Sequence, residues 1–231
     1  MSDWGTAVQM VTERVHRYGT ADPDIVKRGL CYSIGRRNEE DYFFNEDTKD
    51  VSTVAGQFAY DVETGAGAGD GYPIDLIKFK ELSLQTSNTW YPIRNIAIRR
   101  FRKEQVSSSY RGYPEEWCWF NKQLLLSPNP NGAYTVRVDY TKDIGTPIAA
   151  YSSSVWAFTV GGVTLTDTYT NDWFEEGLYL ITNEACYWIF SQILGDTEQA
   201  GLALREVDDQ VDHLYIRSQA SNVPREARPW V

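Results

Sequence analysis

Residue types that commonly do chemistry are scarce in this sequence. Histidine occurs twice, as His16 and His213, and the three cysteines, Cys31, Cys118 and Cys186, lie far apart. Structural zinc sites need closely spaced ligands of these kinds, and a disulfide framework needs an even number of cysteines. The sequence therefore predicts neither a metal site nor a disulfide framework, and it offers little histidine for acid–base catalysis.

Two clusters of acidic residues, 175–176 and 208–212, are the remaining candidates for catalysis. Adjacent residues of a helix point to different faces, and a hydrolytic pair needs surroundings that separate the pKa values of its two carboxyl groups. The chain has no Gly-x-Ser-x-Gly motif of the kind found in serine hydrolases. We interpret both clusters as solvated acidic surface, and we expect neither enzymatic activity nor a cofactor.

A glycine-rich segment spans 64–71 and includes Gly65, Gly67, Gly69 and Asp70. Phosphate-binding loops combine such glycines with a Lys-Ser/Thr pair or with a fixed dinucleotide pattern, and neither is present. A proline and an expected strand follow the segment, so the pattern favours the tip of a β-hairpin. We expect this loop to be available for contact with a partner.

Charge is unevenly distributed along the chain. The sequence has 22 basic and 32 acidic residues, a net charge of −10, whereas proteins that bind nucleic acid over their surface are normally basic. Residues 94–103 nevertheless carry a cationic group, consisting of Arg94, Arg99, Arg100, Arg102 and Lys103. We expect this group to pair with an acidic surface of another subunit. Contact with nucleic acid is the alternative.

The spacing of apolar residues predicts helices near both ends. Residues 5–35 are expected to form two short helices, the second started by the N-cap Asp22 and by Pro23. A long helix, capped by Asn171 or Asp172, is expected to run to about residue 194, and another is expected over 197–218.

The helix expected over 171–194 is apolar nearly all round, as is typical of a helix buried on more than one side. A neighbouring subunit would be the extra partner, and Trp188 and Phe190 are interface candidates. The longest apolar run, 185–194, is too short to cross a bilayer, and the N-terminus has no signal-peptide pattern. We expect a chain made in the cytoplasm, with no membrane association.

Alternating apolar residues predict strands between about 51 and 166, for example in 58–62, 79–84 and 134–140. Pro128 and Pro130 predict a turn over 127–132. Segments 155–160 and 163–166 are expected to form a hairpin joined by Gly161 and Gly162. We expect an antiparallel β domain, most simply a sandwich, with a short helix within 95–105.

The final stretch, 219–231, has no periodic pattern, and we expect an extended tail. A tryptophan flanked by proline and arginine is typical of a docking peptide that becomes ordered on a partner. A frayed terminus is the alternative. The candidate docking residues are Pro224, Arg225, Arg228, Pro229, Trp230 and Val231.

The segment Gly112-Tyr113-Pro114-Glu115-Glu116-Trp117-Cys118-Trp119, with the strand–turn–strand pattern over 122–140, resembles the head-to-tail adaptor proteins of tailed bacteriophages (connector or neck proteins, like tail tubular protein A). Residues 56–60 upstream and 171–200 downstream fit the same order, so the resemblance extends over about 51–210. The loop over 62–72 and the hairpin over 155–166 depart from the family pattern.

The resemblance implies an α+β protein. A helical bundle built from N- and C-terminal helices, 1–50 and 167–218, would accompany a central antiparallel β-sandwich, 51–166, and an extended C-terminal tail, 219–231.

The resemblance also implies a structural virion protein of the neck, between the capsid portal and the tail. Such adaptors form a ring, usually of twelve subunits, that docks on the portal protein and meets a tail nozzle or tail-tube protein, with a tail fibre as a further candidate partner. The genome passes through without specific binding when it is ejected. An acidic channel would repel phosphate, so we expect Glu206, Asp208, Asp209 and Asp212 to face it.

Two other classes of protein remain open. The chain has eight tryptophans and fifteen tyrosines, which a carbohydrate-binding or tail-associated β-sandwich module would use as stacking platforms. A virion hydrolase is the second alternative.

Overall fold

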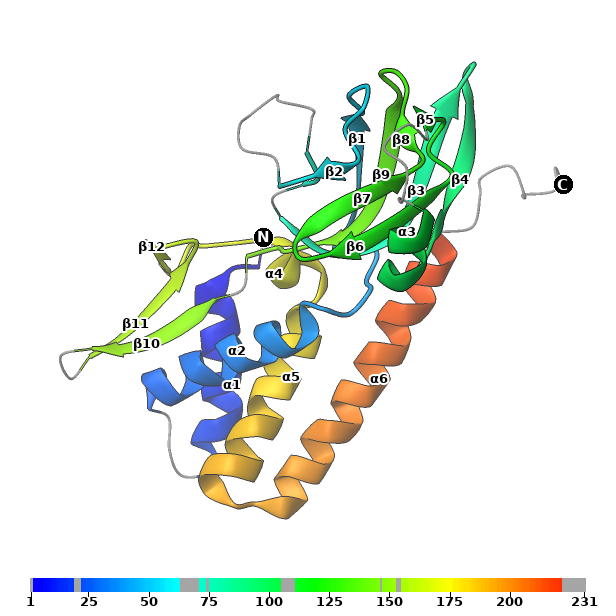
Figure 1. Cartoon of the computed structure of the whole chain (residues 1–231). Coiled ribbons are helices and arrows are strands. Elements are labelled where there is room, and N and C mark those ends of the chain that lie inside the picture. The colour runs from blue at the N-terminus through cyan, green and yellow to red at the C-terminus, as the bar shows by residue number, and fades with distance from the viewer. Residues whose placement is uncertain are drawn as a thin grey trace, which may run out of the picture. The chain divides into compact units, whose positions relative to one another are not determined.

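The computed structural model describes residues 2–18, 22–62, 71–73, 75–104, 111–145, 147–152 and 155–221 (Figure 1). The chain divides into two compact units, which are considered separately. The helical unit comprises 1–45 and 143–231, and the β unit comprises 46–142. The predicted α+β class is confirmed. The unit boundaries differ from the expected ones, because residues 46–50 belong to the β unit and residues 143–166 to the helical unit. The last helix also continues to Ser221, into the range 219–231 that was expected to be an extended tail.

The helices lie close to the ranges that the sequence predicts. Those of the helical unit are α1 (Trp4–His16), α2 (Pro23–Arg37), α4 (Asp172–Glu176), α5 (Leu178–Trp188), the π-helical turn η1 (Ile189–Leu194) and α6 (Thr197–Ser221). Asp22 caps α2, since its carboxylate accepts a hydrogen bond from the amide of Asp24 at 3.0 Å. Asn171 caps α4 by accepting from the amide of Trp173 at 3.1 Å. Both capping predictions are confirmed.

Aromatic side chains fill the core of the helical unit. Trp173 and Phe174 are fully buried, and the Trp173 ring lies 5.0 Å from Phe44 and 5.6 Å from Tyr42 between ring centroids. Gly29 of α2 packs closely on α5, because a Cβ atom added there would lie 3.4 Å from Ala185. Ala185 and Ile189 supply the side chains that face Gly29 at this point, each with an atom 3.4 Å from the position of that added Cβ.

A buried carboxylate connects the same two helices. Glu184 of α5 is completely buried, and its Oε2 accepts a hydrogen bond from Nε of Arg37 at 2.6 Å. Its Oε1 lies 2.9 Å from a guanidinium nitrogen of Arg36, and Arg37 also forms an ion pair with Glu40 at 2.7 Å. One interior negative charge thus holds two guanidinium groups of α2.

A small antiparallel sheet completes the helical unit. It consists of β10 (Ile148–Ser152), β11 (Val155–Val160) and β12 (Val163–Thr164), in that order. Gly161 and Gly162 join β11 to β12 with φ values of +55° and +82°, so the predicted hairpin is confirmed. Phe158 of β11 is buried, with its ring 6.5 Å from that of Trp4. This packing places the hairpin with the helices, whereas the sequence prediction assigned it to the β domain.

The β unit is built on one mixed seven-stranded sheet in the order β1-β9-β3-β4-β6-β7-β2. Its strands are β1 (Glu46–Ser52), β2 (Ala59–Tyr60), β3 (Leu76–Thr86), β4 (Thr89–Asn95), β6 (Glu116–Phe120), β7 (Gln123–Ser127) and β9 (Thr135–Lys142). The β4–β6 pair is parallel and the other pairs of this sheet are antiparallel. The expected helix within 95–105 is present as α3 (Ile98–Glu104).

The expected sandwich is not what the structure contains. The single sheet curls into a half-barrel, so that Val138 of β9 and Leu82 of β3 share one core with Trp117 of β6 and Leu124 of β7. Register shifts between β3 and β9, typical of β-bulges, increase the local twist. A curled sheet covers its own concave face, and no second sheet is needed.

The turn predicted over 127–132 also takes part in pairing. Residues Asn129–Pro130 form a short strand, β8, that pairs in parallel with β5 (Arg111–Gly112). None of the helices in the described part of the chain is both long enough and apolar enough to cross a membrane.

The buried Glu184 gives a stability prediction. Glu184→Gln removes the charge that Arg37 needs in the interior, and we expect the free energy of unfolding to fall by about 3 kcal/mol, since Glu40 remains beside Arg37. Urea denaturation measures this. Glu176→Gln is the matched control, because its pair with Arg217 at 3.0 Å is exposed and contributes less than about 1 kcal/mol. Equal losses in the two variants would contradict the prediction.

Candidate functional site

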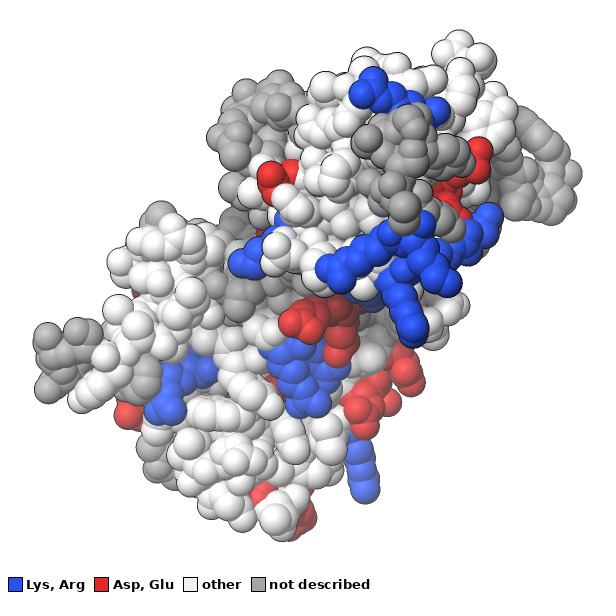
Figure 2. Space-filling view, in the orientation of Figure 1, with Lys and Arg blue, Asp and Glu red and all other residues white. Residues whose placement is uncertain are grey.

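The predicted cationic group of 94–103 forms a continuous surface of the β unit. The helix α3 packs on the sheet through Phe101, which is 3% exposed and lies in a small apolar cluster with Cys118 and Leu125. This packing turns the basic side chains of α3 outward, and Arg99, Arg100, Arg102 and Lys103 are all exposed. Figure 2 shows lysine and arginine side chains gathered over α3.

Glu116 of β6 anchors this cationic surface. It is 8% exposed and accepts a hydrogen bond from Nη2 of Arg100 at 2.6 Å. A guanidinium nitrogen of Arg94 lies 3.8 Å from the same carboxylate, and the guanidinium of Arg102 lies 5.0 Å from the ring centroid of Phe120. The structure therefore brings Arg94, Arg100 and Arg102 together on ordered elements. The role of Glu116 was not foreseen.

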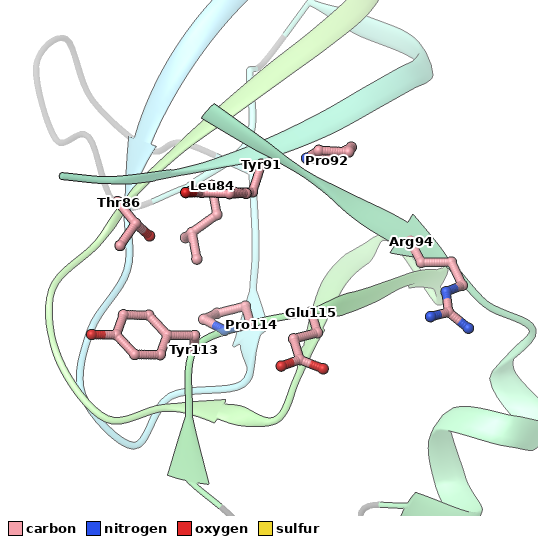
Figure 3. Close-up of a pocket in the computed structure, with 8 residues that line it drawn as sticks. All are labelled: Leu84, Thr86, Tyr91, Pro92, Arg94, Tyr113, Pro114 and Glu115. Atoms are coloured by element: carbon pink, nitrogen blue, oxygen red, sulfur yellow. The ribbon is translucent and has the colours of Figure 1, made fainter. Parts of the chain in front are cut away.

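A cavity of about 370 Å³ lies beside Arg94 in the β unit (Figure 3). Tyr91 and Tyr113 line it with about half of each side chain exposed, 54% and 51%. The remaining lining residues are Leu84, Thr86, Pro92, Arg94, Pro114 and Glu115. In Figure 3, Leu84 points into the space that Tyr113 and Pro114 border on the opposite side. This lining supplies aromatic faces, one guanidinium and one carboxylate, which suits binding by stacking and hydrogen bonds.

An open groove of about 610 Å³ lies on the helical unit between α2 and the start of β10, and we call it the α2–β10 groove. Its apolar lining includes Tyr32, which is 42% exposed, and Ile148, which is 59% exposed. The Tyr32 ring lies 5.9 Å from Trp188, and the guanidinium of Arg28 lies 5.7 Å from the same tryptophan. Residues Cys31, Gly35, Arg36, Pro147 and Ala149 complete the lining.

The two aromatic interface candidates have different surroundings. Trp188 is half-buried and lines the α2–β10 groove, where a partner can reach it. Phe190 is completely buried and meets Tyr18 edge-on at 5.3 Å. Phe190 is thus part of the core rather than of an exposed surface, which corrects the sequence-based assignment.

The four acidic candidates of α6, Glu206, Asp208, Asp209 and Asp212, are all exposed. Glu206 forms an ion pair with Arg14 of α1 at 2.6 Å. The helix is held to its unit by Ala203, Val207 and Leu214, which are buried. Consequently, its acidic residues lie on the solvent side.

Two groups of candidates lie outside the described residues. These are the loop residues Gly65, Gly67, Gly69 and Asp70, and the tail residues Pro224, Arg225, Arg228, Pro229, Trp230 and Val231. In the described ranges, no group of three or more His, Cys, Asp or Glu side chains is placed to hold a metal ion.

The α2–β10 groove was missed because its walls are far apart in sequence. Tyr32, Ile148 and Trp188 meet only when β10 lies beside α2 and the end of α5. The one local signal was Trp188, an aromatic residue at the end of a helix that is apolar on several sides. Comparison with known proteins adds no assignment, since no protein-family model and no curated protein matches the chain.

Cys31, in the groove lining, gives a prediction about alkaline pH. Burial raises the pKa of its thiol from the ordinary value of 9.0 to about 12. As the pH rises above 9.0, the unfolded chain therefore loses a proton that the folded chain keeps, and stability is lost until the pH approaches about 12. We expect Cys31→Ala to reduce the alkaline loss of unfolding free energy by up to about 1.4 kcal/mol per pH unit.

Urea denaturation across this pH range measures the effect. Cys186→Ala should act in the same direction, because burial also raises the pKa of Cys186 to about 12. Ser33→Ala changes a buried residue that has no ionisable thiol. This variant should lose unfolding free energy with rising pH as steeply as the natural protein does. If the Cys31→Ala variant lost unfolding free energy with rising pH as steeply as the natural protein does, the prediction would be contradicted.

Proposed function

We propose that this chain is a structural virion protein, one subunit of a ring-shaped head-to-tail adaptor of a tailed bacteriophage. The sequence resemblance over 51–210 and the α+β architecture support this proposal. The single observation that carries it furthest is that the helical unit exposes two unlike surfaces, an apolar groove and an acidic helix. A ring needs such a pair, because each subunit meets its two neighbours through different surfaces.

The proposed ring is dodecameric, docks on the portal protein and joins it to a tail nozzle or tail-tube protein. Its channel would carry the genome without specific contacts. Exposed carboxylates of α6 support this part of the proposal, since negative charge lining a channel repels DNA phosphates. Tight DNA binding by the isolated ring at physiological salt would contradict an acidic channel.

Assembly tests the proposal directly. Native mass spectrometry of the purified chain, alone and mixed with portal rings from the phage that encodes it, should show one closed oligomer. Deleting 221–231 should abolish docking on the portal while circular dichroism shows an unchanged fold. A chain that stays monomeric in both samples would overturn the adaptor proposal, and docking that survives the deletion would overturn the role of the tail.

A carbohydrate-binding module is the second candidate, and the Tyr91–Tyr113 cavity favours it. Sugar rings stack on exposed aromatic faces, and Arg94 and Glu115 could hydrogen-bond to hydroxyl groups. On this alternative, a glycan array should give binding that Tyr113→Ala weakens at least about tenfold, a change of about 1.4 kcal/mol.

Tyr179→Ala is the matched control for that experiment, since Tyr179 is 62% exposed, belongs to the helical unit and is not among the residues that line the cavity. Absence of glycan binding by the natural chain would remove this candidate.

A further inference from the structure

The α2–β10 groove combines apolar side chains with excess positive charge. Tyr32, Ile148 and Trp188 provide the apolar surface, and Arg28 and Arg36 stand beside it. The helix α2 carries four basic residues, Lys27, Arg28, Arg36 and Arg37, and one acidic residue, Asp24, so its side chains sum to +3. Glu184 and Glu40, which pair with Arg36 and Arg37, offset two of these three charges, so a net charge of +1 remains, with Arg28 and Arg36 at the groove. Its occupant should therefore be apolar and acidic.

The helix α6 exposes a surface with those properties. It carries five acidic residues, Glu198, Glu206, Asp208, Asp209 and Asp212, and two basic ones, Arg205 and Arg217, so its side chains sum to −3. Leu204 and Tyr215 are 38% and 56% exposed, so α6 presents apolar side chains to solvent as well as packing on its own core; Leu202 and Ile216 are also exposed.

These exposed residues lie along one side of α6. Leu204, Asp208 and Tyr215 lie in one row with Val211, at intervals of four, three and four residues along the helix. Val211 is half-buried against the core, and the other three are exposed. Asp212 is adjacent to this row. We call the row with Asp212 the α6 flank. Two apolar side chains and two carboxylates are thereby presented together to solvent.

We propose that the α2–β10 groove of one copy receives the α6 flank of a second copy. Leu204 and Tyr215 contact Tyr32, Ile148 and Trp188 of the other copy, while Asp208 and Asp212 approach the guanidinium groups of Arg28 and Arg36. This inference rests on the proposed ring and names the two surfaces that join its subunits. Because groove and flank are different surfaces of one unit, the contact repeats from copy to copy.

This assignment divides the acidic candidates of α6. Asp208 and Asp212 belong to the flank that meets the neighbour. Asp209 lies on the remaining exposed side of the helix, where it stays available to a channel, whereas Glu206 is paired with Arg14 of α1.

A charge-swap experiment tests the contact. Arg28→Glu alone and Asp208→Arg alone should each weaken self-association of the full chain about tenfold or more, because each places like charges opposite one another. Combining the two changes in one chain should restore most of the affinity. Native mass spectrometry at a series of protein concentrations gives the populations.

Asp209→Arg is the matched control, since it makes the same charge change on the same helix outside the flank. Its self-association should stay close to that of the natural chain. If all three single variants behave alike, or if the combined variant is as weak as the single ones, the inference is overturned.

Disulfide trapping provides an independent test. The double variant Ile148→Cys and Tyr215→Cys, oxidised mildly, should give a ladder of covalently linked copies, because each groove cysteine meets a flank cysteine of the next copy. Absence of the ladder while the chain still forms a closed oligomer overturns this inference alone. A chain that forms no oligomer even with the portal overturns the proposed function as well.

Discussion

A single buried carboxylate ties α2 to α5, beside the apolar packing of Val26, Leu30 and Ile34 of α2 in the same core. Two guanidinium groups of α2 meet Glu184 of α5 in the interior, where an ion is stabilised only by close, well-oriented partners. Farther along α2, Gly29 faces the small side chain of Ala185, so the two helices approach closely there. These contacts fix α2 against α5. Because Arg28, Tyr32 and Arg36 all belong to α2, the groove that we interpret as an assembly surface depends on the same ion pairs.

The β unit positions its candidate residues by a different constraint. Its curled sheet buries one face against itself, and this leaves α3 to pack on β6 and β7 through Phe101, Cys118 and Leu125. Because Phe101 fixes one side of α3 against the sheet, the arginines of the helix lie on its solvent-exposed side. Glu116 then holds Arg100 and lies near Arg94. A cationic surface on ordered elements is the result.

Local patterns predicted most of the elements. Apolar spacing and the capping residues Asp22 and Asn171 located the helices, and the Gly161-Gly162 pair located the β11–β12 hairpin, because each of these signals acts within a few residues. Whether strands close into one curled sheet or two stacked ones depends on long-range pairing, for example of β4 with β6. The alternation of apolar and polar residues along the strands is the same in both architectures, so it could not distinguish them. The predicted sandwich was therefore wrong.

The candidate site was less predictable for the same reason. The sequence identified Arg94, Arg100, Arg102 and Trp188 as surface residues, but it could not separate Trp188 from Phe190. Both lie near the end of an apolar helix, and only the three-dimensional packing that places Phe190 in the core of the helical unit shows which of them is buried. In the proposed ring, charge also selects the mode of association. Two α2 surfaces repel each other, as do two α6 surfaces, so a two-fold dimer through either one is disfavoured. The contact of α2 with α6 is attractive, and contacts between unlike surfaces are the kind from which a ring can be built.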